Sequence, residues 1–242
     1  MTNRISETSL RSSATIAGFG YLIIFITGIF ANFFVLQSLI VPGDVSATAN
    51  NIVANVLLFR FGILGFVVMV VFDVVLVWAL YVLLKPVSKS ISLFSAWFRL
   101  VNATIFGVAL YNLFVVAQLT SGADYLNALD PGQLHARVML SLNTFDYTWL
   151  IGLIFFGVHL LFLGYLILKS GYIPKILGIL LIIAGVGYLV DSLANILLVN
   201  YENYAGILAM IVFVPAFVGE LVFMLWLLIK GGKISEITPE IH

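Results

Sequence analysis

The stretch that decides the fold is residues 69–78, MVVFDVVLVW, in which nine side chains are apolar and the fifth, Asp73, is a carboxylic acid. It lies inside a longer apolar run, 58–84, which ends just before Lys85 and Pro86. A helix of roughly 20 apolar residues crosses the hydrocarbon core of a bilayer. The run therefore predicts a transmembrane helix. Its acid needs a reason to be there, because a charge at mid-membrane costs about 2.5–3.5 kcal/mol.

The composition of the whole chain also indicates a membrane protein. Of its 242 residues, 62% are hydrophobic and 9% are charged, whereas soluble domains contain roughly 25% charged residues. We therefore expect the lipid bilayer to be its main partner. The formal net charge is zero, so a basic surface for nucleic acid is not expected. The absence of cysteine excludes disulfides and thiolate metal sites, and three histidines argue against a multi-histidine metal centre.

Six segments are long enough to span a membrane, which predicts an all-α bundle of six transmembrane helices in one domain, 1–242. They cover about 14–40, 58–84, 92–119, 147–168, 174–199 and 207–230. Local residues explain their ends. Pro42 and Pro86 follow the first two segments, because proline cannot continue a helix. Gly171 suits a C-terminal cap on the fourth segment, and Pro174 suits the first turn of the fifth.

The positions of the lysines indicate the orientation of the helices. The even-numbered connections and the C-terminal end contain Lys85, Lys89, Lys169, Lys175, Lys230 and Lys233. The odd-numbered connections and the span ends beside them contain several acids and only two basic residues, Arg60 and Arg137. By the positive-inside rule, both termini are predicted to be cytoplasmic, in a multi-pass protein of the cytoplasmic (inner) membrane.

Two long outer connections, about 41–57 and 120–146, each contain a signal for the start of a helix. Asp44 or Ser46 can cap the first, and Asp130 followed by Pro131 fits the cap and first position of the second. We expect two short amphipathic helices on or near the outer face. A surface lid without a specific role is an equally good interpretation of both segments.

Ionisable side chains inside the spans fall mainly at one depth. Away from the span ends, these side chains are Asp73, Arg99, His159, Asp191 and Glu220. Asp73 is twelve residues from Lys85, and Arg99, His159 and Glu220 are each ten residues from their nearest lysine on the same side. At about 1.5 Å per residue, all four lie roughly 15–18 Å from the inner boundary. The sequence therefore predicts a buried polar site made of Asp73, Arg99, His159 and Glu220.

The second and third spans are joined by a short turn, KPVSKSI, which makes them antiparallel neighbours. Asp73 and Arg99 then lie at similar depths on adjacent helices, and we predict an ion pair between them, with Glu220 or His159 as possible further partners. Two other interpretations stay open. Arg99 can extend its long side chain toward the cytoplasm, or the pair can have a purely structural role.

Polar residues at three- and four-residue spacing indicate which helix faces point inward. Ser92 and Ser95 share the face of Arg99 in the third span, and a similar stripe runs along the fifth. Joined together, these stripes predict an access path from the outer face to the buried site. The path residues are Asn32, Asn102, Tyr188, Asp191 and Asn195.

Three functional interpretations are open. The first is binding or transport of a small molecule, coupled to protons, at the buried polar site. The second is an intramembrane enzyme acting on lipid, in which His159, Glu220 and Asp73 hold one divalent metal or act as acid and base. The third is a structural or accessory protein that binds a partner through its outer connections. The sequence leaves the substrate and the oligomeric state open.

Several strings occur in order along the chain. They are DVVLVWALYVLLKPVSKSISLFSAWFRLVNA, SGADYL, FFGVHLLFLGYLILKSGYIPKILGILLI, GYLVDSL and PAFVGELVFMLWLLIKG. Together they resemble the bacterial membrane family called domain of unknown function 4386. The resemblance covers nearly the whole chain and implies a multi-pass helical membrane protein. It implies no established activity, so the chemistry rests on the residues named above.

Overall fold

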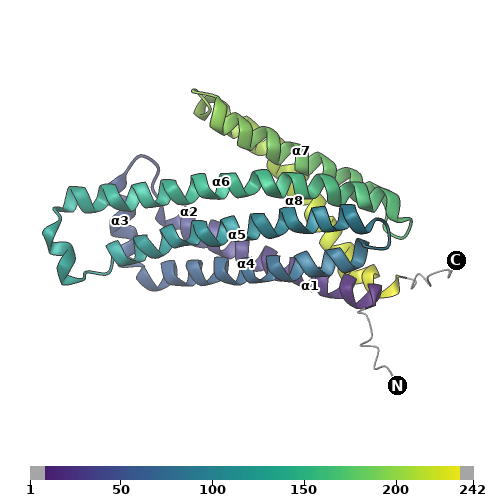
Figure 1. Cartoon of the computed structure of the whole chain (residues 1–242). Helices are drawn as coiled ribbons and strands as arrows, with labels where there is room; N and C mark the ends of the chain where they lie inside the picture. Colours follow the sequence, from purple (N-terminus) through teal and green to yellow (C-terminus); the bar gives the residue numbers. More distant parts are fainter. Residues whose placement is uncertain (1–8, 235–242) are drawn as a thin grey trace, which may run out of the picture. The chain divides into compact units, whose positions relative to one another are not determined.

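The computed structural model describes residues 9–234, apart from the side chains of Glu202, Ala209, Ile211 and Phe213, and this part of the chain contains helices and no strand. The long helices are α1 (Leu10–Ile29), α4 (Val56–Leu84), α5 (Lys89–Leu119), α6 (Pro131–Ser170), α7 (Lys175–Leu197) and α8 (Glu202–Lys230) (Figure 1). The short elements are the π-helical η1 (Phe30–Leu36), α2 (Gln37–Leu39), α3 (Val45–Ala54), and the 3-10 segments η2 (Asp124–Ala128) and η3 (Gly231–Lys233).

Six helical segments of the described chain are long and apolar enough to cross a membrane. They are Leu10–Leu39, Val56–Leu84, Lys89–Leu119, Pro131–Ser170, Lys175–Leu197 and Val214–Lys233. Each corresponds to one predicted span. The all-α, multi-pass architecture expected from the sequence is therefore confirmed.

The predicted start and stop signals act through backbone hydrogen bonds and dihedral angles. Asp44 Oδ1 accepts a hydrogen bond from the backbone N–H of Ala47 at 2.8 Å and so caps α3. Asp130 does the same for Gln133 at the start of α6, at 2.9 Å. After α6, Gly171 has a φ of +73°, a conformation that favours glycine and ends the helix.

The second predicted amphipathic helix is not a separate element. It begins at Pro131 as expected, but α6 then continues for 40 residues to Ser170 without a break. At about 1.5 Å per residue such a helix is roughly 60 Å long, about twice the thickness of a hydrocarbon core. The predicted boundary between the outer connection, 120–146, and the span 147–168 falls among the polar residues of 143–148. They mark a change of polarity along one helix, because none of them is a glycine or a proline that would interrupt it.

The chain forms two compact units. The first draws its described residues from Met1–Leu22, Asp73–Asn102 and Leu153–His242. The second consists of Ile23–Phe72 and Ala103–Gly152. All four residues of the predicted buried site belong to the first unit.

Within the first unit, glycines let α6 and α7 approach closely. A Cβ atom added to Gly164 would lie 2.6 Å from the backbone oxygen of Gly178, and one added to Gly157 would lie 2.9 Å from that of Gly185. The two helix backbones therefore touch at both places, as the small residues of this segment predict. The two ends of the described chain also meet, because Arg11 Nε donates a hydrogen bond to the backbone oxygen of Ile234 at 2.8 Å.

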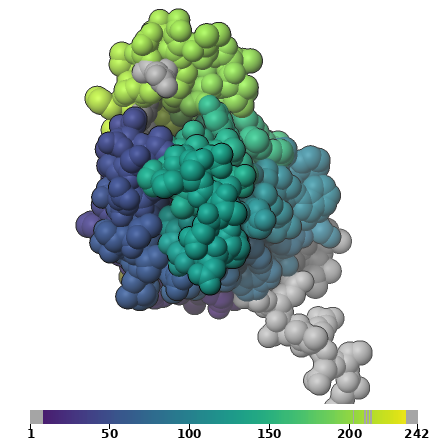
Figure 2. All heavy atoms as spheres, turned by 90° about the vertical axis from the view of Figure 1, so that its left-hand side faces the viewer, coloured from purple at the N-terminus to yellow at the C-terminus, as the bar shows by residue number. Residues whose placement is uncertain are grey.

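Within the second unit, α3 lies beside the start of α6, as the blue and teal surfaces of Figure 2 show. Ser46 Oγ and His135 Nδ1 join these two segments at 3.2 Å. An aromatic group that includes Phe106 and Trp149, stacked at 3.7 Å between ring centroids, packs inside this unit. The contact between Ser46 and His135 thus joins α3 to the start of α6, and the rings of Phe106 and Trp149 pack α5 against α6.

Candidate polar site in the first unit

The ion pair predicted between Asp73 and Arg99 is present. Arg99 Nη2 on α5 lies 2.5 Å from Asp73 Oδ1 on α4, and both residues are buried. The arginine therefore does not extend toward the end of its helix. It turns to the neighbouring helix, where the opposite charge offsets part of the cost of burial.

Two further helices contribute partners to the same guanidinium. Arg99 Nη1 donates to the hydroxyl of Tyr21 on α1 at 3.2 Å. The same nitrogen lies 3.1 Å from Nε2 of His159 on α6. We call the five residues Tyr21, Asp73, Ser95, Arg99 and His159 the arginine cluster. His159 lies beside Arg99, as their equal distances from the nearest lysines predicted. Tyr21 was not predicted, and the signal for it was a phenol in the middle of an apolar span.

The partners of His159 determine which of its nitrogens carries the proton. An arginine N–H can only donate, so Nε2 must accept from Arg99 with its lone pair. The proton then sits on Nδ1, which lies 2.9 Å from the backbone oxygen of Ser95 and can donate to it. A second proton on Nε2 would face the arginine donor directly. The arrangement therefore requires a neutral imidazole.

Aromatic rings complete the surroundings of the guanidinium. Its central carbon lies 5.1 Å from the ring centroid of Tyr21 and 5.4 Å from that of Phe156. Cation–π contacts of this kind are stronger when the cation is removed from water. Among the described residues, Arg99 Nε has no hydrogen-bond partner. The positive charge is thus held by one carboxylate, two polar acceptors and two aromatic faces.

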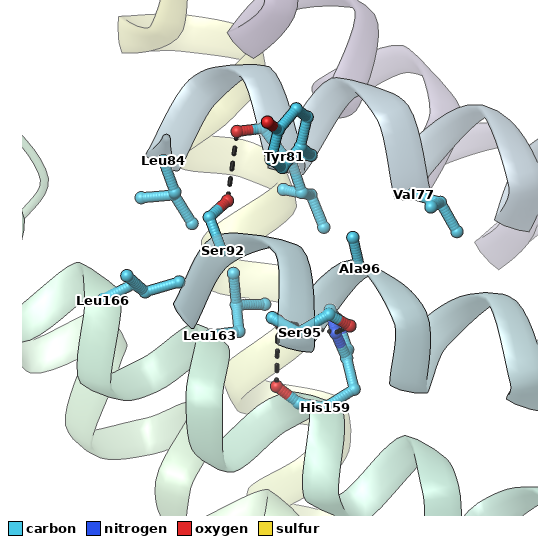
Figure 3. A pocket seen from close by; sticks show the side chains of 10 residues that line it. Val77, Tyr81, Leu84, Ser92, Ser95, Ala96, His159, Leu163 and Leu166 are labelled. Carbon is cyan, nitrogen blue, oxygen red and sulfur yellow. Dashed lines mark hydrogen bonds between the residues drawn. The ribbon is translucent and has the colours of Figure 1, made fainter. Parts of the chain in front are cut away.

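A narrow pocket borders the cluster between α4, α5 and α6 (Figure 3). Dashed lines join Ser95 to His159 and Ser92 to the backbone oxygen of Tyr81, the latter at 3.1 Å. The pocket is too narrow to hold a water molecule. In this conformation the arginine cluster is closed, and its side chains form hydrogen bonds to one another, whereas Arg99 Nε has no partner among the described residues.

Glu220 lies next to this cluster but is held by a different residue. Its carboxylate accepts a hydrogen bond from the hydroxyl of Tyr188 on α7 at 3.3 Å. It is also close enough to interact electrostatically with Arg99 and Asp73. Glu220 and Tyr188 are half-buried, whereas Asp73, Arg99 and His159 are at most 4% exposed. The predicted four-residue site is therefore one closed cluster with a more accessible carboxylate beside it.

A second pair of the same kind lies nearer the end of α7. The hydroxyl of Tyr201 donates to Asp191 Oδ1 at 2.8 Å, and Asn195 also bonds to Tyr201. Burial, followed by the hydrogen bond to Asp191, raises the pKa of Tyr201. The phenol therefore stays protonated and remains a donor at neutral pH. Three of the five predicted path residues, Tyr188, Asp191 and Asn195, thus take part in polar contacts between α7 and the segment that begins at Tyr201.

The other two path residues are placed differently. Asn102 is fully buried on α5, three residues after Arg99 and on the same helix face. Asn32 lies in the π-helical segment η1 of the second unit and is half-buried. A path through Asn32 stays a prediction. The contacts that the structure shows run along α7 and α8.

The candidate metal ligands His159, Glu220 and Asp73 are not grouped as a metal site. Among residues 9–234, no three His, Asp or Glu side chains lie in an arrangement that could hold an ion. The reason is the arginine, which uses both an oxygen of Asp73 and the free lone pair of His159. The equal depths of these residues indicated proximity correctly, but depth alone did not show that a cation of the protein itself lies between them.

The chain is similar to a protein family of unknown function and to an uncharacterised archaeal protein. A family model described as Domain of unknown function (DUF4386) matches residues 16–231. A protein of Archaeoglobus fulgidus, named "Uncharacterized protein", is 38% identical over 178 residues, which cover 74% of this chain and 88% of that relative. This relative comes from an archaeon, whereas the resemblance noted in the sequence was to a family described as bacterial. No solved structure shows a significant match to the chain.

Proposed function

Because this chain belongs to the family described as Domain of unknown function (DUF4386), we infer its role from its geometry and propose that it is an integral membrane protein for proton-coupled binding or transport of a small polar molecule. The observation that most directly supports this proposal is a pair of hydrogen bonds, from Tyr201 to Asp191 and from Tyr188 to Glu220. We call these four residues the tyrosine–carboxylate row. This row leads along α7 and α8 to the buried charge of Arg99.

The chemistry of these pairs suits proton transfer. A carboxylic acid inside a membrane lowers its insertion cost when it takes up a proton. A tyrosine hydroxyl donates to the carboxylate when the acid is ionised, and it can accept from the acid when the acid is protonated. Tyr188 can therefore stay bonded to Glu220 in both states. The hydroxyl of Tyr201 donates in the same way to Asp191, which lies about one turn from Tyr188 along α7.

The arginine cluster supports the coupling part of the proposal. Arg99 interacts with Glu220, so the charge state of the acid changes the electrostatic energy of the guanidinium. Loss of the negative charge on Glu220 would leave Asp73 as the main anion beside Arg99. A polar ligand with a negative group could then compete for the arginine once the cluster opens. Binding of the ligand and of the proton would in this way affect each other.

The proposal is tested with purified full-length protein in lipid vesicles that contain a pH-sensitive dye. An imposed pH difference should collapse faster with the wild-type protein than in empty vesicles. Glu220→Gln should reduce that rate to the level of empty vesicles, because glutamine cannot exchange a proton. Asp146→Asn is the matched control, since Asp146 is an exposed acid of the second unit, and it should keep the wild-type rate.

An unchanged rate in Glu220→Gln would contradict the role of the tyrosine–carboxylate row. If the pH difference collapses at the same rate with the wild-type protein as in empty vesicles, the protein does not move protons in the absence of a ligand. Proton exchange that requires a ligand would then be measured in the same vesicles. The lipid-directed enzyme and the accessory protein remain alternatives. No specific contact of the described residues favours either of them.

A further inference from the structure

A second feature of the first unit lies away from the polar site, where α7 begins and α8 ends. A cavity of about 560 Å³ opens there. The charged and aromatic residues that line the cavity are Tyr172, Lys175, Trp226, Lys230 and Lys233. These residues are distant in sequence, and they meet because α7 starts next to the C-terminal end of α8. The cavity is therefore a product of the fold rather than of one basic segment.

The charge of this cavity is positive. Three of its nine lining residues are lysines, and none is acidic. Among the described residues, none of the three lysines forms an ion pair. The cavity also contains the start of α7, whose N-cap residue, Pro174, provides no side-chain hydrogen bond to the first amides. The partial positive charge of a helix N-terminus thus adds to that of the lysines.

The other lining groups fit the boundary between lipid and water. Trp226 lies near the end of a membrane-spanning helix, a position where tryptophan is enriched because its ring is apolar and its N–H is polar. The hydroxyl of Tyr172 donates to the backbone oxygen of Leu83 at 2.6 Å, which fixes its ring at the cavity. Burial raises the pKa of Tyr172 to about 12, so the phenol adds no negative charge.

We propose that this cavity binds the phosphate headgroup of an anionic phospholipid. Three lysines and an uncapped helix N-terminus recognise the negative phosphate. The apolar lining and Trp226 suit the start of the acyl chains. A soluble phosphate would use the same lysines but would gain nothing from the apolar groups. Because both helices span the membrane, their ends lie at the depth of the headgroups, where basic pockets between helices bind anionic lipids.

The experiment measures lipid binding to the full-length protein in detergent by native mass spectrometry, with phosphatidylglycerol and phosphatidylcholine as probes. The test variant is Lys175→Gln/Lys230→Gln/Lys233→Gln. The matched control, Lys85→Gln/Lys89→Gln/Lys169→Gln, removes the same charge from lysines that do not line the cavity. A basic residue near a membrane surface is worth about a fivefold change in binding, so we expect about a 100-fold loss in the test variant and a small change in the control.

Two further measurements distinguish the sources of the phosphate and exclude a folding defect. The variant Lys175→Arg/Lys230→Arg/Lys233→Arg keeps the charge and should keep the preference for phosphatidylglycerol, and circular dichroism checks its helix content. Inorganic phosphate should compete only weakly with the lipid. Equal losses in the two glutamine variants, no preference over phosphatidylcholine, or full displacement by inorganic phosphate would each overturn the proposal.

Discussion

At the scale of single residues, the burial of Arg99 depends on Asp73. The two are at most 4% exposed, and no other carboxylate touches the guanidinium within hydrogen-bond distance among residues 9–234. Removal of one partner of a buried ion pair leaves an uncompensated charge. We therefore expect Asp73→Asn to lower the free energy of unfolding by about 3–5 kcal/mol. Unfolding of the variant in mixed detergent micelles measures this loss of stability, and Asp146→Asn is the control variant.

The same pair allows a second measurement that separates charge from packing. The double variant Asp73→Leu/Arg99→Met replaces both charges with apolar groups, and such replacements are often neutral in buried pairs. It should recover most of the stability lost in Asp73→Asn. If Asp73→Asn is as stable as the wild type, the ion pair contributes nothing measurable and the argument for its role fails.

Tyr21 has a smaller expected effect, because only its hydroxyl would be removed. Tyr21→Phe keeps the ring that lies against the guanidinium but deletes the acceptor for Arg99 Nη1. Hydrogen bonds to charged groups contribute about 1.5–3 kcal/mol, so we expect a loss of that size. Tyr111→Phe, on the exposed face of α5, is the matched control and should change stability little. Equal effects would show that the bond to Arg99 is unimportant.

At the scale of the elements, the contact between α6 and α7 requires glycine. A Cβ on Gly164 would meet a backbone oxygen of α7 at 2.6 Å, so Gly164→Ala must push the helices apart. Such overpacking costs about 1–3 kcal/mol. Gly107→Ala is the matched control, because its Cβ would meet its nearest neighbour at 4.0 Å and alanine is the better helix former. Thermal unfolding of both variants checks this. Equal melting temperatures would contradict the close contact.

At the scale of the whole molecule, the number of spans and the lysines predict that both termini are cytoplasmic. The hydrogen bond between Arg11 and Ile234 places the two described ends of the chain next to each other, which supports termini on the same side. Reporter fusions test it. A reporter active only in the cytoplasm should work at either terminus and fail when inserted after Gly122. Activity at one terminus only would contradict an even number of spans.

Much of this architecture was predictable because it depends on local properties. Hydropathy, proline and glycine positions, and the caps Asp44 and Asp130 act within a few residues, so six spans and several helix ends followed from the sequence. The length of α6 did not, because the polar residues of 143–148 resemble those of a turn, although none of them is a proline or a glycine that would end a helix. The Asp73–Arg99 pair was predictable because a short turn fixes the depth of both residues on neighbouring helices.

By itself, then, the sequence determined an all-α membrane protein with an acid and a base buried at one depth, since residue spacing along a helix sets depth. The tertiary structure alone decided which side chains meet at that depth. It placed Tyr21 and Phe156 against Arg99, made His159 an acceptor, and bonded Glu220 to Tyr188. It also joined the lysines of α7 and α8 around one cavity. The physical reason is that these contacts depend on how each helix is rotated about its axis, and that rotation is set by packing against other helices.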